Sequence, residues 1–94
     1  MPSEQQVDWD AVSHVTASQY RQAAVQALVD GPATPTGITE DTGHDIAHIS
    51  RSLQNLREED IVELLVSEDR RKGRYYGLTE HGERVADRVA EVTA

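Results

Sequence analysis

The sequence predicts a single domain of the α+β class, mainly helical, with its elements in the order helix, helix, helix, strand, strand, helix. Apolar residues recur at spacings of three and four along residues 18–60, which is the period of an α-helix. Residues 61–78 instead hold a β-branched run and an aromatic run around a polar turn, which is typical of a strand hairpin. The 94 residues suffice for one compact core and are too few for a deep enzyme cleft.

Ser18 begins the first predicted helix, because a serine hydroxyl caps the free amide groups at a helix N-terminus. Gly31 and Pro32 end it, since neither residue continues a helix. One apolar stripe runs between these limits, made of Tyr20, Ala23, Ala24, Ala27 and Leu28.

Two helices separated by a glycine turn follow. Thr34 places a capping hydroxyl before Pro35, a residue favoured at the first helical position, and Gly43 ends this short helix. Asp45 then caps the third helix, which continues to about Asp60. The side of this helix that we expect to face the core consists of Ile46, Ile49, Leu53 and Leu56.

The strand hairpin is predicted from residues 61–66 and 74–78, which are joined by an entirely polar turn. After it, Thr79 caps a last helix. The apolar side of that helix consists of Val85, Val89 and Val92.

The chain before Ser18 is predicted to divide in two. Residues 1–8 are polar and we expect them to be disordered, whereas residues 9–94 form the folded domain. The spacing of Trp9, Val12 and Val15 indicates a further helical turn or helix whose packing partner the sequence does not identify.

A short helix, a glycine turn and a regular helix followed by a charged hairpin predict a winged helix-turn-helix. The third helix, about residues 46–59, would be the recognition helix, because its polar side carries Ala47, His48, Arg51, Gln54 and Asn55. Arg pairs with guanine, Gln and Asn pair with adenine, and Ala leaves room for a thymine methyl group. A solvated helix face would have a similar composition, so this face alone does not decide the function.

The turn of the hairpin is the predicted wing, about residues 67–74. Four basic side chains cluster there in an acidic chain, namely Arg70, Arg71, Lys72 and Arg74. Such a cluster fits the phosphates or the minor groove of DNA. The alternative is a merely soluble turn whose charge Glu68 and Asp69 neutralise. Thr34 and the amide groups of the second helix are a further candidate for a phosphate contact.

The net charge of −8 opposes nucleic-acid binding, but its distribution is uneven. Residues 42–57 and 67–78 are both net basic, so most of the acids lie elsewhere. With one Lys among nine basic residues and no Phe, the composition resembles that of cytoplasmic proteins of extreme halophiles.

Other kinds of site have little support in the sequence. There is no Cys, no apolar stretch of membrane-spanning length and no phosphate-binding loop or hydrolase motif. The four His residues are scattered, and a metal site at His44 and His48 is disfavoured because His44 is expected in the turn. We expect no catalytic residue, no metal and no cofactor, and a cytoplasmic protein.

From about Ser18 to Val85 the chain resembles small haloarchaeal winged-helix transcription regulators of the MarR type. In MarR-like proteins a D-x-R pair in the wing is followed by L-T-x-x-G, and the matching residues here are Asp69, Arg71, Leu78, Thr79 and Gly82. The resemblance implies that Asp69 braces Arg71, that Arg51 and its neighbours contact the major groove, and that the terminal helices dimerise. Here D-x-R and L-T are closer together than is usual, and the chain is shorter than most such regulators.

The sequence therefore predicts a transcription regulator that binds double-stranded DNA sequence-specifically, and not an enzyme. The alternative is a winged-helix adaptor that binds other proteins in a transcription or repair assembly. We expect a homodimer, since two apolar stripes on terminal helices need cover. The residues predicted in the dimer interface are Trp9, Val12, Val85, Val89 and Val92. The operator, the regulated genes and any small-molecule effector are not encoded in a recognisable way.

Overall fold

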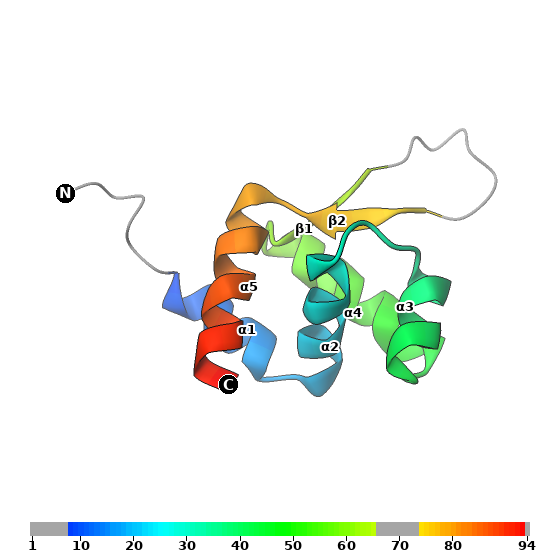
Figure 1. Ribbon diagram of the computed structural model, residues 1–94, viewed down its shortest axis with the longest axis horizontal. Coiled ribbons are helices and arrows are strands. Elements are labelled where there is room, and N and C mark those ends of the chain that lie inside the picture. The colour runs from blue at the N-terminus through cyan, green and yellow to red at the C-terminus, as the bar shows by residue number, and fades with distance from the viewer. Residues whose placement is uncertain (1–7, 66–73, 94) are drawn as a thin grey trace.

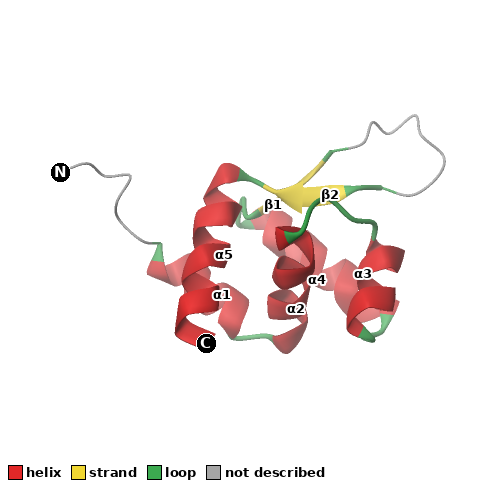
Figure 2. Ribbon diagram, in the orientation of Figure 1, coloured by secondary structure: helices red, strands yellow, loops and turns green. Residues whose placement is uncertain are grey.

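The computed structural model describes residues 8–65 and 74–93, and its elements follow the predicted order with one helix added at the N-terminal end. Four helices precede the hairpin and one follows it (Figures 1 and 2). In chain order, the helices and strands are α1 (Trp9–Thr16), α2 (Gln19–Val29), α3 (Pro35–Thr42), α4 (Ile46–Glu58), β1 (Val62–Leu64), β2 (Tyr76–Leu78) and α5 (Glu80–Thr93). The mainly helical winged-helix prediction is thus confirmed.

Side-chain caps begin most of the helices where the sequence predicts them. The Ser18 hydroxyl accepts hydrogen bonds from the amides of Tyr20 and Arg21, and the Thr34 hydroxyl accepts one from Gly37. The third predicted cap differs. Asp45 precedes α4, but its side chain makes no capping hydrogen bond.

The N-terminal helix is capped by a residue that the sequence assigned to a disordered segment. The Asp8 carboxylate accepts a hydrogen bond of 3.1 Å from the amide of Ala11 and so begins α1. The rest of that segment, residues 1–7, lies outside the described residues, as do residues 66–73 and 94.

The hairpin is antiparallel, with Val62 opposite Leu78 and Leu64 opposite Tyr76. Its strands are shorter than predicted, with three residues each. A second connection joins it to the helices, because Ala33 in the link between α2 and α3 exchanges two backbone hydrogen bonds with Tyr76, of 3.0 and 2.9 Å. The wing base and the start of α3 are therefore parts of one hydrogen-bonded unit.

The core lies around α2, which contacts α1, α3, α4, α5 and β2. Its members are aliphatic almost throughout, and the largest fully buried ones are Ile38, Ile49, Leu53, Leu56, Ile61, Val15, Val25, Val85 and Val89. One predicted core residue is exposed instead. Ile46 is the first residue of α4 and is 43% exposed, and the buried side of the helix begins at Ile49.

Three residues predicted in a dimer interface are instead buried within the chain. Val12, Val85 and Val89 are at most 4% exposed, because α1 and α5 pack against each other and against α2. The apolar sides of α1 and α5, which the sequence predicts to need an external partner, thus cover each other. Trp9 and Val92, at 56% and 53% exposed, are the members that remain on the surface.

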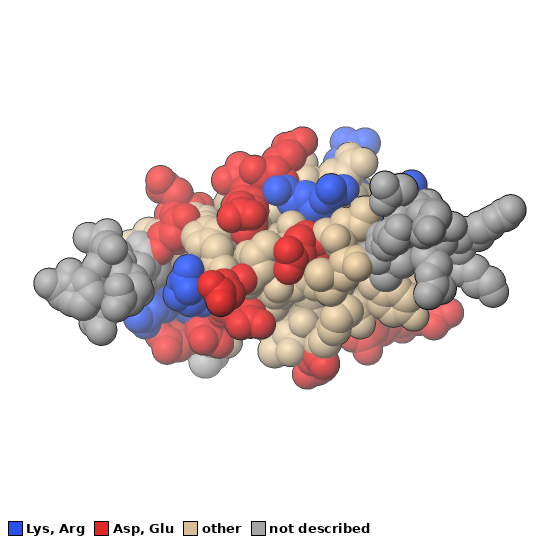
Figure 3. Space-filling model, turned by 90° about the horizontal axis from the view of Figure 1, so that it is seen from above, with Lys and Arg blue, Asp and Glu red and all other residues tan. Residues whose placement is uncertain are grey.

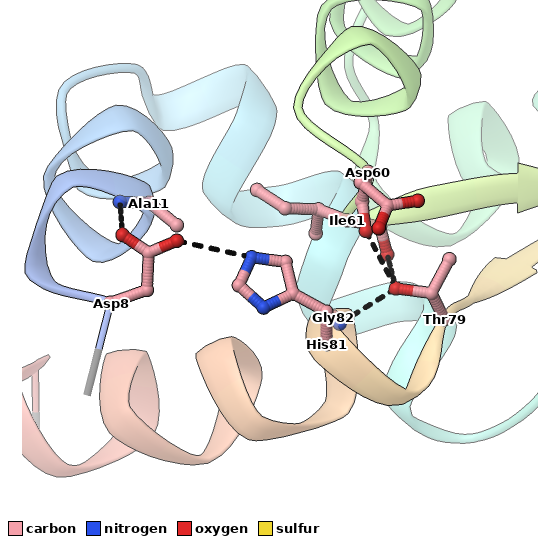
Figure 4. A network of polar contacts seen from close by, with 7 residues as sticks. All are labelled: Asp8, Ala11, Asp60, Ile61, Thr79, His81 and Gly82. Atoms are coloured by element: carbon pink, nitrogen blue, oxygen red, sulfur yellow. Dashed lines mark hydrogen bonds and ion pairs between the residues drawn. The ribbon is translucent and has the colours of Figure 1, made fainter. Parts of the chain in front are cut away.

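Hydrogen bonds of Thr79 join the start of α5 to the residues that follow α4 (Figure 4). The Thr79 hydroxyl donates to the carbonyl oxygen of Asp60 at 2.7 Å and accepts from the amide of Gly82 at 2.8 Å. Thr79 also donates its amide to the carbonyl oxygen of Ile61 at 3.1 Å. Asp60 has a positive φ of 62°, which Asp tolerates better than most residues and which turns the chain out of α4.

Gly82 permits this close approach. A Cβ atom there would lie 2.0 Å from the carbonyl oxygen of Ile61, which is backbone and cannot rotate away. The glycine of the L-T-x-x-G pattern is thus required by packing, and the threonine is the cap that the resemblance implies.

One histidine is held in an environment that disfavours its charged form. The Nε2 atom of His14 is buried and has no hydrogen-bond partner among the described residues. Burial lowers the pKa of His14 below its ordinary value of 6.5, and the nearby charge of Arg21 lowers it further, while Glu59 and Glu58 oppose the shift.

None of the described helices, of which α5 is the longest with 14 residues, has the length and apolar character that crossing a membrane requires.

We predict that Gly82→Ala destabilises the fold by about 1–3 kcal/mol or more, because the added methyl group forces α5 away from Ile61. Urea unfolding followed by circular dichroism measures the loss. Asp87→Ala, at an exposed position of the same helix, should change the stability by less than about 0.5 kcal/mol. Equal stability of the two variants would contradict the packing role of Gly82.

We also predict that protonation of His14 makes the fold less stable in acid. As the pH falls below 6.5 the unfolded chain binds a proton at His14 that the folded chain, with its lower pKa, does not yet bind, so unfolding is favoured. Between about pH 7 and pH 5 the free energy of unfolding should therefore fall less in His14→Gln than in the original chain. An equal or steeper fall in the variant would show that His14 is not responsible.

Candidate nucleic-acid interface

The helices α3 and α4 pack against each other and form the two parts of the predicted helix-turn-helix. Gly43 links them in a left-handed conformation, with φ of 80°, and donates its amide to the carbonyl oxygen of Thr39 at 2.8 Å. This turn is the one that the sequence predicts, and glycine is the residue that adopts it without strain. It fixes the direction in which α4 leaves α3.

The two sides of α4 differ as the sequence predicts. Ile49, Leu53 and Leu56 are buried, and so is Ser52, whose small side chain fits between α4 and the core. The polar side faces away from the core, with Ala47, His48, Arg51 and Gln54 exposed and Asn55 half-buried. The exposure of the first four is thereby established, whereas the contact of all five with DNA remains a prediction.

The Arg51 side chain is exposed on α4. The described residues hold contacts of His81 with Asp8 and of Arg88 with Glu91, and neither involves Arg51. An exposed guanidinium group presents five hydrogen-bond donors in a planar arrangement.

Of the predicted wing, the structure describes Arg74 at its base. Arg74 is exposed and stands next to Tyr75, which is 46% exposed and whose carbonyl accepts from the amide of Leu65 at 2.8 Å. The other three predicted wing residues, Arg70, Arg71 and Lys72, lie outside the described residues, together with Asp69.

Thr34 has a structural role that limits its predicted contact with phosphate. Its hydroxyl oxygen accepts the amide of Gly37 at 2.9 Å, but its hydrogen can still be donated outward. The side chain is half-buried at the start of α3. It therefore remains compatible with both functions.

The acidic charge is spread over the body of the protein. Figure 3 shows Asp and Glu side chains scattered across the face seen from above, with basic side chains between them. At the end of α4, Glu58 and Glu59 are exposed beside Arg57. Exposed acidic side chains thus flank α4 at both ends, since Asp45 directly precedes its first residue.

Sequence reasoning missed an aromatic contact on the first turns of α4. The ring of Tyr20, at the start of α2, is stacked on His48, with centroids 4.2 Å apart and planes at 7°. It also meets the edge of His44, with centroids 5.0 Å apart and planes at 83°. The sequence predicts Tyr20 in the apolar stripe of α2, and no local pattern indicates that its ring contacts α4.

Among the described residues, no cluster of three or more His, Asp and Glu side chains has the arrangement of a metal site.

The comparison with protein families finds one matching model, described as HVO_A0261 N-terminal domain, over residues 9–94. This range begins with α1 and extends past the end of α5. No curated protein matches the sequence significantly.

Solved structures share the fold. YodB from B. subtilis superimposes with a TM-score of 0.77 at 23% identity, over 99% of this chain and 89% of YodB. A mutant of ZitR from Lactococcus lactis gives 0.70 at 20% identity, over 79% of this chain and 51% of ZitR. MarR from E. coli superimposes with a TM-score of 0.72 at 17% identity, over 87% of this chain and 62% of MarR.

The present chain thus corresponds to about half the length of ZitR and most of that of YodB. YodB is described as a transcriptional regulator. The MarR-like resemblance is confirmed at the level of the fold.

Proposed function

Since the chain belongs to the HVO_A0261 N-terminal domain family and has the fold of MarR-like transcription regulators, we propose that it binds double-stranded DNA sequence-specifically and regulates transcription. The observation that supports this most directly is the exposed polar side of α4, which follows the turn at Gly43 and faces away from the core. A helix with one apolar and one polar side is the form in which this fold enters the major groove.

The chemistry of that side suits base recognition. The Arg51 guanidinium group can form two hydrogen bonds to a guanine, and the amides of Gln54 and Asn55 can do so to an adenine. Ala47 leaves space for a thymine methyl group, and His48 adds a ring nitrogen on the first turns. These residues would determine sequence preference.

The contacts with the DNA backbone would come from the flanking elements. Arg74 at the wing base, with Arg70, Arg71 and Lys72 beyond it, would approach phosphates or the minor groove. Thr34 would donate its hydroxyl to a phosphate near the start of α3. These contacts add affinity and little sequence preference.

A second copy of the chain is part of this proposal. Trp9 on α1 and Val92 on α5 are large apolar side chains that the chain's own core leaves exposed. A dimer formed through them would place two α4 helices on one DNA duplex, which predicts an inverted repeat in the preferred site.

We predict that Arg51→Ala weakens binding to a DNA site selected from random sequences by about 1–3 kcal/mol and hardly affects binding to random DNA. Selection and titration are carried out in concentrated potassium chloride, to match the acidic composition. Arg84→Ala, which removes an exposed arginine on α5, is the control and should leave both affinities unchanged. If the chain binds only a protein partner and no DNA, selection yields no recurring sequence.

We predict that the dimer depends on the outer side of α5. Light scattering should give twice the monomer mass for the original chain and the monomer mass for Val92→Asp. Val29→Asp, a similarly exposed valine on α2 at 58%, should remain dimeric. A monomer in all three samples would exclude the dimer while leaving the DNA contact of one subunit in place.

A further inference from the structure

We propose that Tyr20 is a positioning residue for DNA recognition, which holds the imidazole of His48 in the orientation that contacts a base. This inference rests on the proposed function and adds to it a residue outside the helix-turn-helix. Its basis is the contact between the start of α2 and the first turns of α4, where the two rings are stacked 4.2 Å apart.

The Tyr20 ring is itself held from several directions. The backbone amide of Tyr20 donates to the Ser18 hydroxyl at 3.2 Å, so the residue that carries the ring is fixed at the capped end of α2. The ring of His44, in the turn before α4, makes a second contact with the Tyr20 ring, T-shaped with planes at 83°. The amide of His44 donates to the Thr42 hydroxyl at 3.2 Å, which in turn donates to the carbonyl oxygen of Ile38 at 2.8 Å.

This arrangement leaves His48 both fixed and accessible. The His48 side chain is exposed although one face of its imidazole is stacked on the half-buried Tyr20. The two nitrogens of an imidazole are its hydrogen-bonding atoms, and they lie in the plane of the ring rather than on the stacked face. A free histidine on a helix surface would exchange between rotamers and would have to be ordered on binding.

Tyr20 therefore reduces the conformational entropy that His48 loses on binding, without itself contacting DNA. Ordering one flexible side chain at an interface weakens affinity by about threefold to tenfold. Among the predicted base-contacting residues that the structure describes, His48 is the one whose ring stacks on Tyr20, so the effect is expected at the base pair contacted by His48. Packing alone would give no such dependence on one base pair.

The test uses the full chain and a DNA site selected by it from random sequences. The base pair that His48 contacts is identified as the one at which His48→Ala loses discrimination among the four alternatives. Affinities are then measured for Tyr20→Phe, Tyr20→Leu, His48→Ala and the double variant Tyr20→Leu/His48→Ala. Circular dichroism checks that each is folded, and proton NMR of the imidazoles reports the stacking.

We expect Tyr20→Leu to weaken binding about threefold to tenfold and to lose discrimination at the same base pair as His48→Ala. In the double variant the leucine should add little to the effect of His48→Ala, because the residue that it positions is gone. Tyr20→Phe retains the stacked ring and should bind like the original chain. The His48 ring protons should shift in Tyr20→Leu much more than in Tyr20→Phe.

Three results would overturn the inference while leaving the proposed function intact. These are additive losses in the double variant, a loss in Tyr20→Leu that is uniform over all base pairs, and a loss in Tyr20→Phe equal to that in Tyr20→Leu. The last would make the tyrosine hydroxyl the important group. If the original chain selects no sequence at all, the proposed function fails first and this inference with it.

A second variant covers the case in which Tyr20→Leu does not fold. His44→Leu removes the T-shaped contact with the Tyr20 ring and leaves the sequence of α2 unchanged. It should lower discrimination at the same base pair, by less than Tyr20→Leu would. Unchanged discrimination in a folded His44→Leu, together with unshifted His48 ring protons, would then overturn the inference.

Discussion

The contact between the backbone of Ile61 and the first turn of α5 is the constraint on which the arrangement of this domain depends. It is made where α4 ends, where β1 begins and where the chain returns from the wing, so one junction sets the mutual positions of three elements. A side chain at Gly82 would separate them. In a core of small aliphatic residues, with no Phe to span a gap, such a separation could not be filled.

Close packing at this junction also determines what remains on the surface. Because α5 lies tightly against the rest of the chain, Val85 and Val89 join Val12 and Val15 from α1 in the same core. The apolar sides of the two terminal helices are thereby used within one chain. The cover of these two helices therefore does not require a second subunit, in contrast to proteins whose terminal helices have no cover until they dimerise.

The sequence predicts the elements of this fold well because the signals that begin and end them are local. Ser18, Thr34 and Thr79 each cap a helix through a hydroxyl a few residues from its partner, and Gly43 has the left-handed turn that follows a helix. Which surface an apolar stripe covers is not local. The pattern of Val85 and Val89 is the same whether α1 or a second subunit lies against it, and only the structure decides between them.

The candidate site shows the same division. The exposed side of α4 follows from its period, so the positions of Arg51 and Gln54 are predicted correctly, whereas Ile46 lies too near the helix start for the period to place it. The stacking of Tyr20 on His48 joins residues far apart in the sequence and depends on the angle between α2 and α4. The spacing of residues in the sequence does not predict that angle, because it results from the packing of the whole core.

The backbone bridge between Ala33 and Tyr76 gives the domain a property that its separate elements would lack. Ala33 directly precedes Thr34, the cap of α3, and Tyr76 is the first residue of β2 after the wing. A change in the twist of the hairpin therefore moves the start of the helix-turn-helix as well, since two hydrogen bonds join them. Substitutions in the hairpin and at the start of α3 should consequently be inherited as a pair, and a graft of this wing onto another helix-turn-helix would need the Ala33 link as well.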